Sequence, residues 1–145
     1  MRLQKNTSLA LYSVLEFART PERHIAAAEI AEKYDISAHH LAKVLAELAR
    51  SGLLASVRGA GGGYRFTGNA KRLTLMDIIQ MFEDFGDSAA AAAAPQSGPV
   101  EAALGLVLSE IDENARATFK SITLATMLRL VERQQAGTAA SRSTP

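Results

Sequence analysis

The sequence contains no cysteine and only three histidines among its 145 residues. Without cysteine the chain cannot form disulfides, thiolate metal sites or a cysteine nucleophile. Two of the histidines, His39 and His40, are adjacent, so we expect no histidine-only metal site. The serine and histidine residues lack an acidic third partner at any diagnostic spacing. The sequence therefore predicts no catalytic set and no enzyme.

Long apolar runs are also absent: none approaches the ~20 residues that a membrane span requires. The first residues, Met1 to Asn6, lack the apolar stretch of a signal peptide. We therefore expect a cytoplasmic protein with no membrane partner. Hydrophobic residues make up 48% of the chain, which is enough for one folded domain with a core.

The net charge of +1 conceals an asymmetry between the two halves of the chain. Residues 1–72 contain eleven Lys and Arg against six Asp and Glu, a balance of +5. Residues 73–145 contain five against nine, a balance of −4. This pattern indicates that the N-terminal half meets a polyanion while the other half has a different task.

Three stretches of the basic half have the apolar spacing of amphipathic helices, namely residues 7–19, 27–34 and 38–51. Ser37 is a candidate N-cap of the third helix, and Gly52 is a candidate C-terminal glycine. A three-residue turn joins the second and third helices. This order predicts a helix-turn-helix.

A glycine-rich stretch, residues 56–66, follows the third helix. It is not a nucleotide-binding loop, because both common phosphate-binding motifs would need a glycine where Tyr64 stands. Both motifs also need a helix directly after the loop, whereas residues 64–67 read as a strand. The stretch therefore predicts a hairpin whose turn needs Gly59, Gly61, Gly62 and Gly63 for positive φ angles.

A helix-turn-helix followed by a hairpin is the order of a winged helix, in which the later helix enters a major groove and the hairpin reaches the backbone or the minor groove. The residue types on these elements can contact phosphates and base edges. The candidate DNA-binding residues are Ser37, His39, His40, Lys43, Arg50, Arg58, Gly59, Gly61, Gly62, Gly63, Tyr64 and Arg65.

Each of these residues also has a structural interpretation. Lys43 and Arg50 alone are more typical of a solvated helix face, and Glu47 is a carboxylate between them. Arg58 and Arg65, which we expect at the two ends of the turn, could simply keep an edge hairpin soluble. Because all of them occur in one motif of the basic half, we favour the interpretation that they bind nucleic acid.

The second half begins with a capping-box-like helix start at Thr74 and Asp77. Residues 86–99 are small and breaker-rich and predict a linker, and residues 100–135 predict two helices. The first helix, residues 100–119, has an apolar stripe too long for the monomer to bury. We expect a dimer interface of Val100, Leu104, Val107, Leu108, Ile111, Ala115 and Phe119.

The predicted organisation is mainly α with a small β hairpin. It comprises a winged helix-turn-helix domain over residues 1–85, the linker 86–99, dimerisation helices over 100–135 and a disordered tail over 136–145.

Four segments together resemble the Rrf2 family of bacterial winged-helix regulators. They are "EIAEKYDIS", "LAELARSGLLASVRGAGGGYRF", "LTLMDIIQMFE" and "ITLATML". The resemblance covers roughly residues 1–134, and Arg58 to Tyr64 is its most specific part. It implies a homodimer built on the long helix, with a recognition helix and a wing from each subunit on palindromic DNA.

The chain departs from the family in two places. Members that bind an iron–sulfur cluster have three cysteines in the loop before the long helix, whereas this loop contains Ala89 to Ala94. Cluster-binding relatives also have a glutamate where Ala42 follows Leu41, so their operator sequence does not carry over. The chain is either a natural member without a cluster or one whose ligand cysteines were replaced by alanine. We prefer the first, because the C-terminal tail also favours alanine.

The sequence thus predicts a dimeric, sequence-specific DNA-binding transcriptional regulator, a repressor, with no cofactor. Its partners would be double-stranded DNA, a second copy of the chain, and a small-molecule or protein effector. The alternative is a winged-helix module whose hairpin docks a protein partner.

Overall fold

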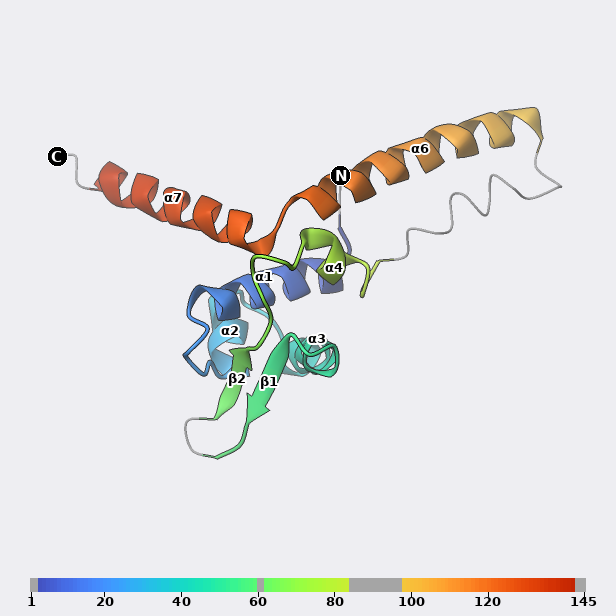
Figure 1. Ribbon diagram of the computed structural model, residues 1–145. Coiled ribbons are helices and arrows are strands. Elements are labelled where there is room, and N and C mark those ends of the chain that lie inside the picture. Colours follow the sequence, from blue (N-terminus) through green and yellow to red (C-terminus); the bar gives the residue numbers. More distant parts are fainter. Residues whose placement is uncertain (1–2, 60–61, 84–97, 143–145) are drawn as a thin grey trace.

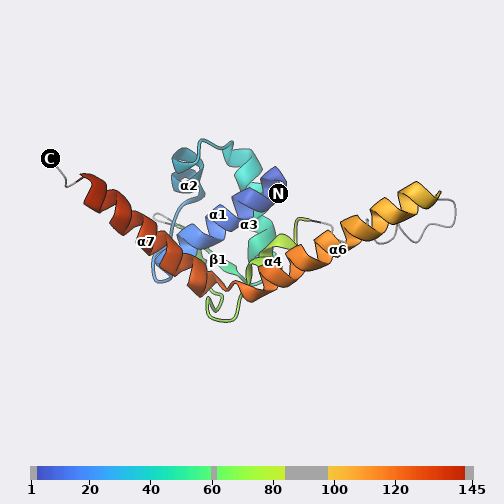
Figure 2. The ribbon, with the colours of Figure 1, turned by 90° about the horizontal axis from the view of Figure 1, so that it is seen from above.

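The computed structural model describes residues 3–59, 62–83 and 98–142. Short helices and one hairpin form the body of the molecule, and two long helices leave it in opposite directions (Figures 1 and 2). In chain order the elements are α1 (Lys5–Arg19), α2 (Ala27–Lys33), α3 (Ala38–Arg50), β1 (Leu54–Val57), β2 (Gly63–Phe66), α4 (Leu75–Ile79), α6 (Pro99–Ser121) and α7 (Leu124–Arg142).

The core lies where α1, α3 and α4 meet, and their apolar stripes fill it. Phe17 of α1, Leu41 and Leu45 of α3, and Ile78 of α4 are fully buried. Leu124 at the start of α7 is buried as well, so α7 begins inside the body before it projects outward. Amphipathic spacing therefore predicted the core-facing side of each short helix.

Backbone hydrogen bonds fix the start of α7 to the segment before α4. The amide of Leu75 donates to the carbonyl of Ile122 at 2.9 Å, and the amide of Leu124 donates to the carbonyl of Leu73 at 2.8 Å. Thr74 and Asp77 form the predicted capping box of α4. The start of α7 is thus attached to the helix-turn-helix body by backbone hydrogen bonds.

Most helix boundaries agree with the sequence prediction, and one differs. Ser37 caps α3 by accepting a hydrogen bond from the His40 amide at 3.4 Å, and Gly52 follows α3 with a φ of +86°. In contrast, α7 continues to Arg142 through residues that the sequence predicted as a disordered tail. Alanines in this stretch favour a helix strongly enough to outweigh the single Gly137.

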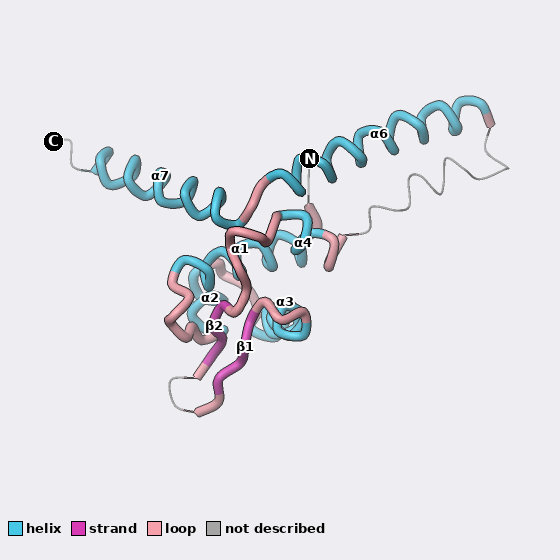
Figure 3. The backbone as a smooth tube through the Cα atoms, viewed as in Figure 1, coloured by secondary structure: helices cyan, strands magenta, loops and turns pink. Residues whose placement is uncertain are grey.

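Within the described residues, the regular strands are those of the antiparallel hairpin (Figure 3). Its register pairs Leu54 with Phe66 and Val57 with Gly63. Ile25, in the connection before α2, extends this sheet, because its amide and carbonyl exchange hydrogen bonds with those of Tyr64 at 2.8 and 2.9 Å. The hairpin is therefore attached to the body along β2, which the sequence did not predict.

Glu16 of α1 fixes α2 against α1. Its carboxylate accepts hydrogen bonds from Lys33 Nζ and from the Tyr34 hydroxyl, each at 2.6 Å. Burial raises the pKa of Glu16, but these hydrogen bonds and the charges of Lys33 and Arg19 outweigh it. They hold the pKa below its ordinary value of 4.5.

Replacing Glu16 with glutamine should lower the free energy of unfolding at pH 7 by about 1 kcal/mol, because Lys33 is half-exposed and water screens its charge. The folded-state pKa is lowered, so the advantage of the wild type is complete above pH 4.5 and is lost as the pH falls through the folded-state value. Urea unfolding of both proteins at pH 7, 5 and 4 measures this difference. Equal stability at pH 7 would contradict the assignment.

No helix of the described residues is both long and apolar enough to cross a membrane.

Candidate nucleic-acid interface

Helix α3 presents an exposed face opposite its buried stripe. Leu41, Val44, Leu45 and Leu48 point into the core, whereas His39, Ala42, Lys43, Ala46 and Glu47 are exposed. Two of these exposed residues, Ala42 and Ala46, are small, and the others have long polar or charged side chains. His39 and Lys43 lie on this face as predicted and can donate hydrogen bonds to phosphates or base edges.

His40 does not lie fully on the outer face, contrary to the sequence prediction. Its side chain is half-buried, and it lines a groove together with Asn6, Met81 and Phe82. Within the described part of the chain, its Nε2 atom is buried and has no hydrogen-bond partner. The sequence could not show this orientation, because Met81 and Phe82 come after the hairpin in the chain, far from His40. Ser37 likewise uses its hydroxyl to cap α3.

Arg50, at the C-terminal end of α3, forms an ion pair with Glu47. Both side chains are exposed, so the pair is open to water and a phosphate could compete for the guanidinium. Lys43 has no ion pair with any described residue. Lys43 is thus the α3 cation that is immediately available to an anionic partner.

Arg58 and Gly59, directly after β1, are exposed. Arg58 follows the last paired residue of β1, and Gly59 next to it has a φ of +106°, in the left-handed region that favours glycine. Gly61 lies outside the described residues. Gly62 does not have the positive φ that the sequence predicted. A Cβ there would meet the carbonyl oxygens of Val57 and Gly59, so the turn needs a glycine at this position for space.

Arg65 lies within the body of the hairpin and not at the end of the turn as predicted. The register places it opposite Ala55, because pairing continues outward to Val57 and Gly63 before the turn begins. Its side chain is exposed. Arg58 therefore lies next to the turn, whereas Arg65 lies further from it along β2, so the two arginines do not flank one loop.

Gly63 and Tyr64 are packing residues in this structure. A Cβ on Gly63 would lie 2.6 Å from the carbonyl carbon of Ile25 and 2.8 Å from the amide nitrogen of Ala26, which is too close for any side chain. The ring of Tyr64 meets Phe17 edge-on with centroids 6.2 Å apart. Both residues hold the hairpin against the body. This packing accounts for a glycine and a tyrosine at the end of the segment Arg58 to Tyr64 without any contact to DNA.

Helix α6 has no buried residue. Five of the seven predicted interface residues are exposed, by between 45% and 81%: Val100, Leu104, Val107, Leu108 and Ile111. Ala115 and Phe119, the other predicted interface residues, are half-buried near the body. Leu106 is 68% exposed but lies off the stripe, and the sequence prediction did not include it.

Comparison with known proteins agrees with this geometry. Residues 3–130 match the model of the Rrf2 family, described as an iron-dependent transcriptional regulator. The chain is 50% identical over 135 residues to BadM of Rhodopseudomonas palustris, an HTH-type transcriptional regulator, covering 93% of this chain and 86% of that protein.

Solved structures of similar fold include IscR of T. potens, with a TM-score of 0.74 and 25% identity over 93% of this chain and 91% of that one. The cysteine regulator CymR of B. subtilis has a TM-score of 0.72 and 24% identity over 90% and 98% of the two chains.

Thiolate ligation of the iron named in the description of the family does not fit this chain. There is no cysteine to supply thiolates. Among the described residues, no three His, Asp or Glu side chains come together as a metal site. The fold and the comparisons nevertheless agree on one identity: the chain is a winged-helix, DNA-binding transcriptional regulator of the Rrf2 family, and not an enzyme.

Proposed function

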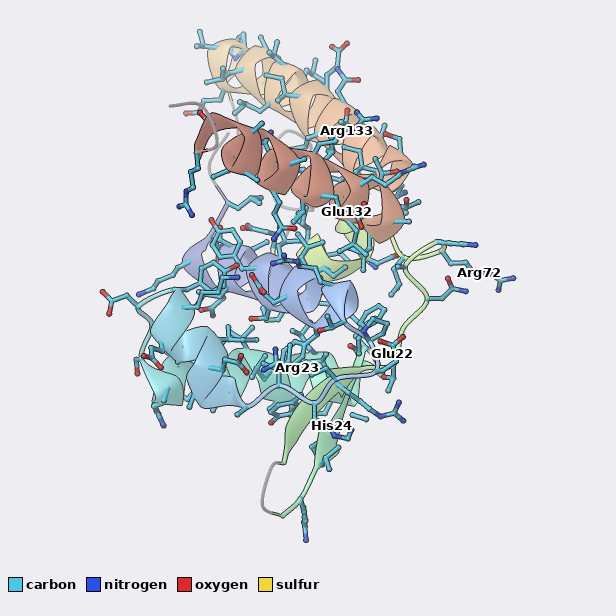
Figure 4. The ribbon with its side chains drawn as sticks, turned by 90° about the vertical axis from the view of Figure 1, so that its left-hand side faces the viewer. Glu22, Arg23, His24, Arg72, Glu132 and Arg133 are labelled. Atoms are coloured by element: carbon cyan, nitrogen blue, oxygen red, sulfur yellow. The ribbon has the colours of Figure 1, made fainter. Side chains whose placement is uncertain are left out.

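We propose that two copies of the chain form a dimer through α6 and read a palindromic operator, each through α3 and its hairpin. The observation that carries this proposal is the polarity of the molecule. The hairpin projects from one end of the body, and α6 and α7 lie at the other end (Figures 1 and 4). A dimer joined at α6 would keep both reading surfaces free.

The proposed DNA contacts follow from exposure. Lys43 and His39 enter the major groove from α3, and Arg50 meets a flanking phosphate. Arg58 and the turn around Gly59 and Gly62 reach the minor groove or the backbone. Arg65 meets the backbone from the exposed face of the hairpin. His40 and Tyr64 are left out of this set, because their side chains pack against the body.

The apolar stripe of α6 supplies the dimer contact. Exposed aliphatic side chains at this spacing are typical of a helix that packs against a symmetry mate. Such a dimer bound over a promoter would exclude polymerase, and we therefore propose a cytoplasmic repressor. Sequencing of sites selected from a random duplex pool at moderate salt tests the proposal. Enriched palindromes with half-sites about one helical turn apart, or a multiple of it, would support it.

The roles of the two cations can be separated by salt dependence. Lys43→Ala and Arg58→Ala should each weaken binding to the selected duplex. A residue that contacts phosphate should weaken all sequences about equally and reduce the slope of log K against log salt by about one. A residue that contacts a base should cost about 1–3 kcal/mol at one position and relax specificity there. We expect the second behaviour for Arg58, because it stands beside the tip of the hairpin.

Lys120→Ala is the matched control, since Lys120 is an exposed cation of α6, outside the proposed reading surface. Fluorescence anisotropy over a range of salt concentrations measures all three variants. If Lys43→Ala and Arg58→Ala retain the affinity and salt slope of Lys120→Ala, the proposed reading surface is wrong.

A further inference from the structure

A cleft of about 440 Å³ lies on the side of the molecule away from the α3 groove, where α1, α2 and α7 come together. Figure 4 looks onto this side, with α7 above α1 and the connection that carries Arg23 below it. The volume is within the range of about 300–1,000 Å³ that is typical of small-molecule sites. The cleft is also at the junction between the DNA-binding body and the C-terminal helix.

Three apolar side chains lie among the mostly polar residues that line the cleft. Ile25 and Ile30 are buried beneath it, and Leu128 of α7 closes one side. An aliphatic or aromatic group placed there would be removed from water at about 25 cal/mol per Å² of apolar area. The site therefore favours a ligand with an apolar part.

The rim of the cleft is charged but balanced. Its cations are Arg19, Arg23 and Lys33, and its carboxylates are Glu16, Glu29 and Glu132. Arg23 pairs with Glu29 at 2.9 Å, and Lys33 pairs with Glu16 at 2.6 Å. A neutral rim does not favour a multiply charged anion such as a nucleotide.

Two rim groups of opposite sign have unused hydrogen-bonding capacity. Arg19 lies 3.6 Å from Glu16, and its side chain donates no hydrogen bond within the described ranges. The Arg19 side chain is 29% exposed, and its guanidinium could hold a carboxylate with two parallel N–H groups. Glu132 of α7 also lines the cleft, is exposed and has no ion pair with any residue that the structure describes. Next to it, Gln135 adds a further donor and acceptor.

We propose that this cleft binds a free α-amino acid with an apolar side chain. Arg19 holds its carboxylate, Glu132 holds its ammonium group, and the side chain lies over Ile25, Ile30 and Leu128. A carboxylic acid or an amine alone would leave one of the two charged partners unused.

The cleft is connected to the hairpin. Ile25, in its floor, exchanges two backbone hydrogen bonds with Tyr64 of β2. A ligand held between α7 and this segment would fix the position of the hairpin relative to the C-terminal helices. On the proposed function, on which this step rests, the amino acid is the effector that changes DNA affinity.

Isothermal titration of the full chain, without DNA, tests the site. L-leucine should bind saturably, whereas 4-methylpentanoate and 3-methylbutylamine, which lack one charged group each, should bind at least about tenfold more weakly. Glu132→Gln and Arg19→Gln should each weaken L-leucine binding by a similar factor. Arg133→Gln, the neighbour of Glu132 outside the lining of the cleft, should leave it unchanged.

Three results would overturn the proposal. The first is that no apolar amino acid binds at millimolar concentration. The second is that 4-methylpentanoate binds as tightly as L-leucine. The third is that Glu132→Gln binds L-leucine as tightly as Arg133→Gln does. Anisotropy with the selected duplex then measures the coupling, and equal DNA affinity with and without L-leucine would refute it. If the protein binds L-leucine but no DNA, the cleft is still an amino-acid site and the proposed function is refuted.

Discussion

Replacing Leu108 with glutamate should convert the protein from a dimer into a monomer. Leu108 lies in the middle of the exposed stripe of α6, between Leu104 and Ile111. In a two-fold symmetric interface the substitution would bury two unpaired carboxylates, each at a cost of several kcal/mol. We therefore expect the dissociation constant of the dimer to rise at least about 100-fold. Binding to the selected palindrome should fall with it, because a monomer contacts only one half-site.

Sedimentation velocity over a range of concentrations measures the first effect, and anisotropy measures the second. Ala117→Glu is the matched control, because residue 117 is exposed on the side of α6 away from the stripe. Circular dichroism should show the same helix content in both variants. A Leu108→Glu variant that sediments like Ala117→Glu would exclude this face of α6 as the interface.

The parts of the fold that were predictable from the sequence depend on local signals. Apolar residues at helical spacing, the cap at Ser37 and the glycine after α3 lie within a few residues of what they control. The stripe of α6 was predictable for the same reason. The order of these elements then predicted a winged helix, and the resemblance to the family implied a homodimer on palindromic DNA.

The parts that were missed depend on contacts between distant segments. Ile25 joins the sheet as a single residue, and no alternating pattern marks one residue as a strand. His40 is turned toward Met81 and Phe82, which lie about forty positions later in the chain. The cleft beside Arg19 exists only because α7 returns to α1 after the whole of α6. No periodic pattern of residues in the sequence predicts any of these contacts.

Gly63 shows how a correct motif can receive an incomplete explanation. A glycine-rich turn predicts positive φ angles, and Gly59 has one at +106°. Gly63, in contrast, lies in β2, where its missing side chain lets the backbone of Ile25 and Ala26 pass at contact distance. The same run of glycines therefore serves two purposes, a tight turn at its start and a close strand contact at its end.

Gly63→Ala should consequently affect both stability and DNA binding. The new methyl group would overlap the backbone of Ile25, so the hydrogen bonds between Ile25 and Tyr64 cannot keep their geometry. We expect a loss of about 2–3 kcal/mol in the free energy of unfolding, and a melting temperature lower by roughly 6–12 °C.

The hairpin of the Gly63→Ala variant should also lose its fixed position relative to α3, so binding to the selected duplex should weaken beyond the effect of Arg58→Ala, which leaves this contact intact. Gly137→Ala is the control, because Gly137 lies in α7 with open space around it. That change should raise stability by about 0.5–1 kcal/mol, since alanine favours a helix more than glycine does. If Gly63→Ala melts like the wild type and binds DNA equally well, residues 25–26 do not hold the hairpin. The wing must then be positioned by α3 and β1 alone.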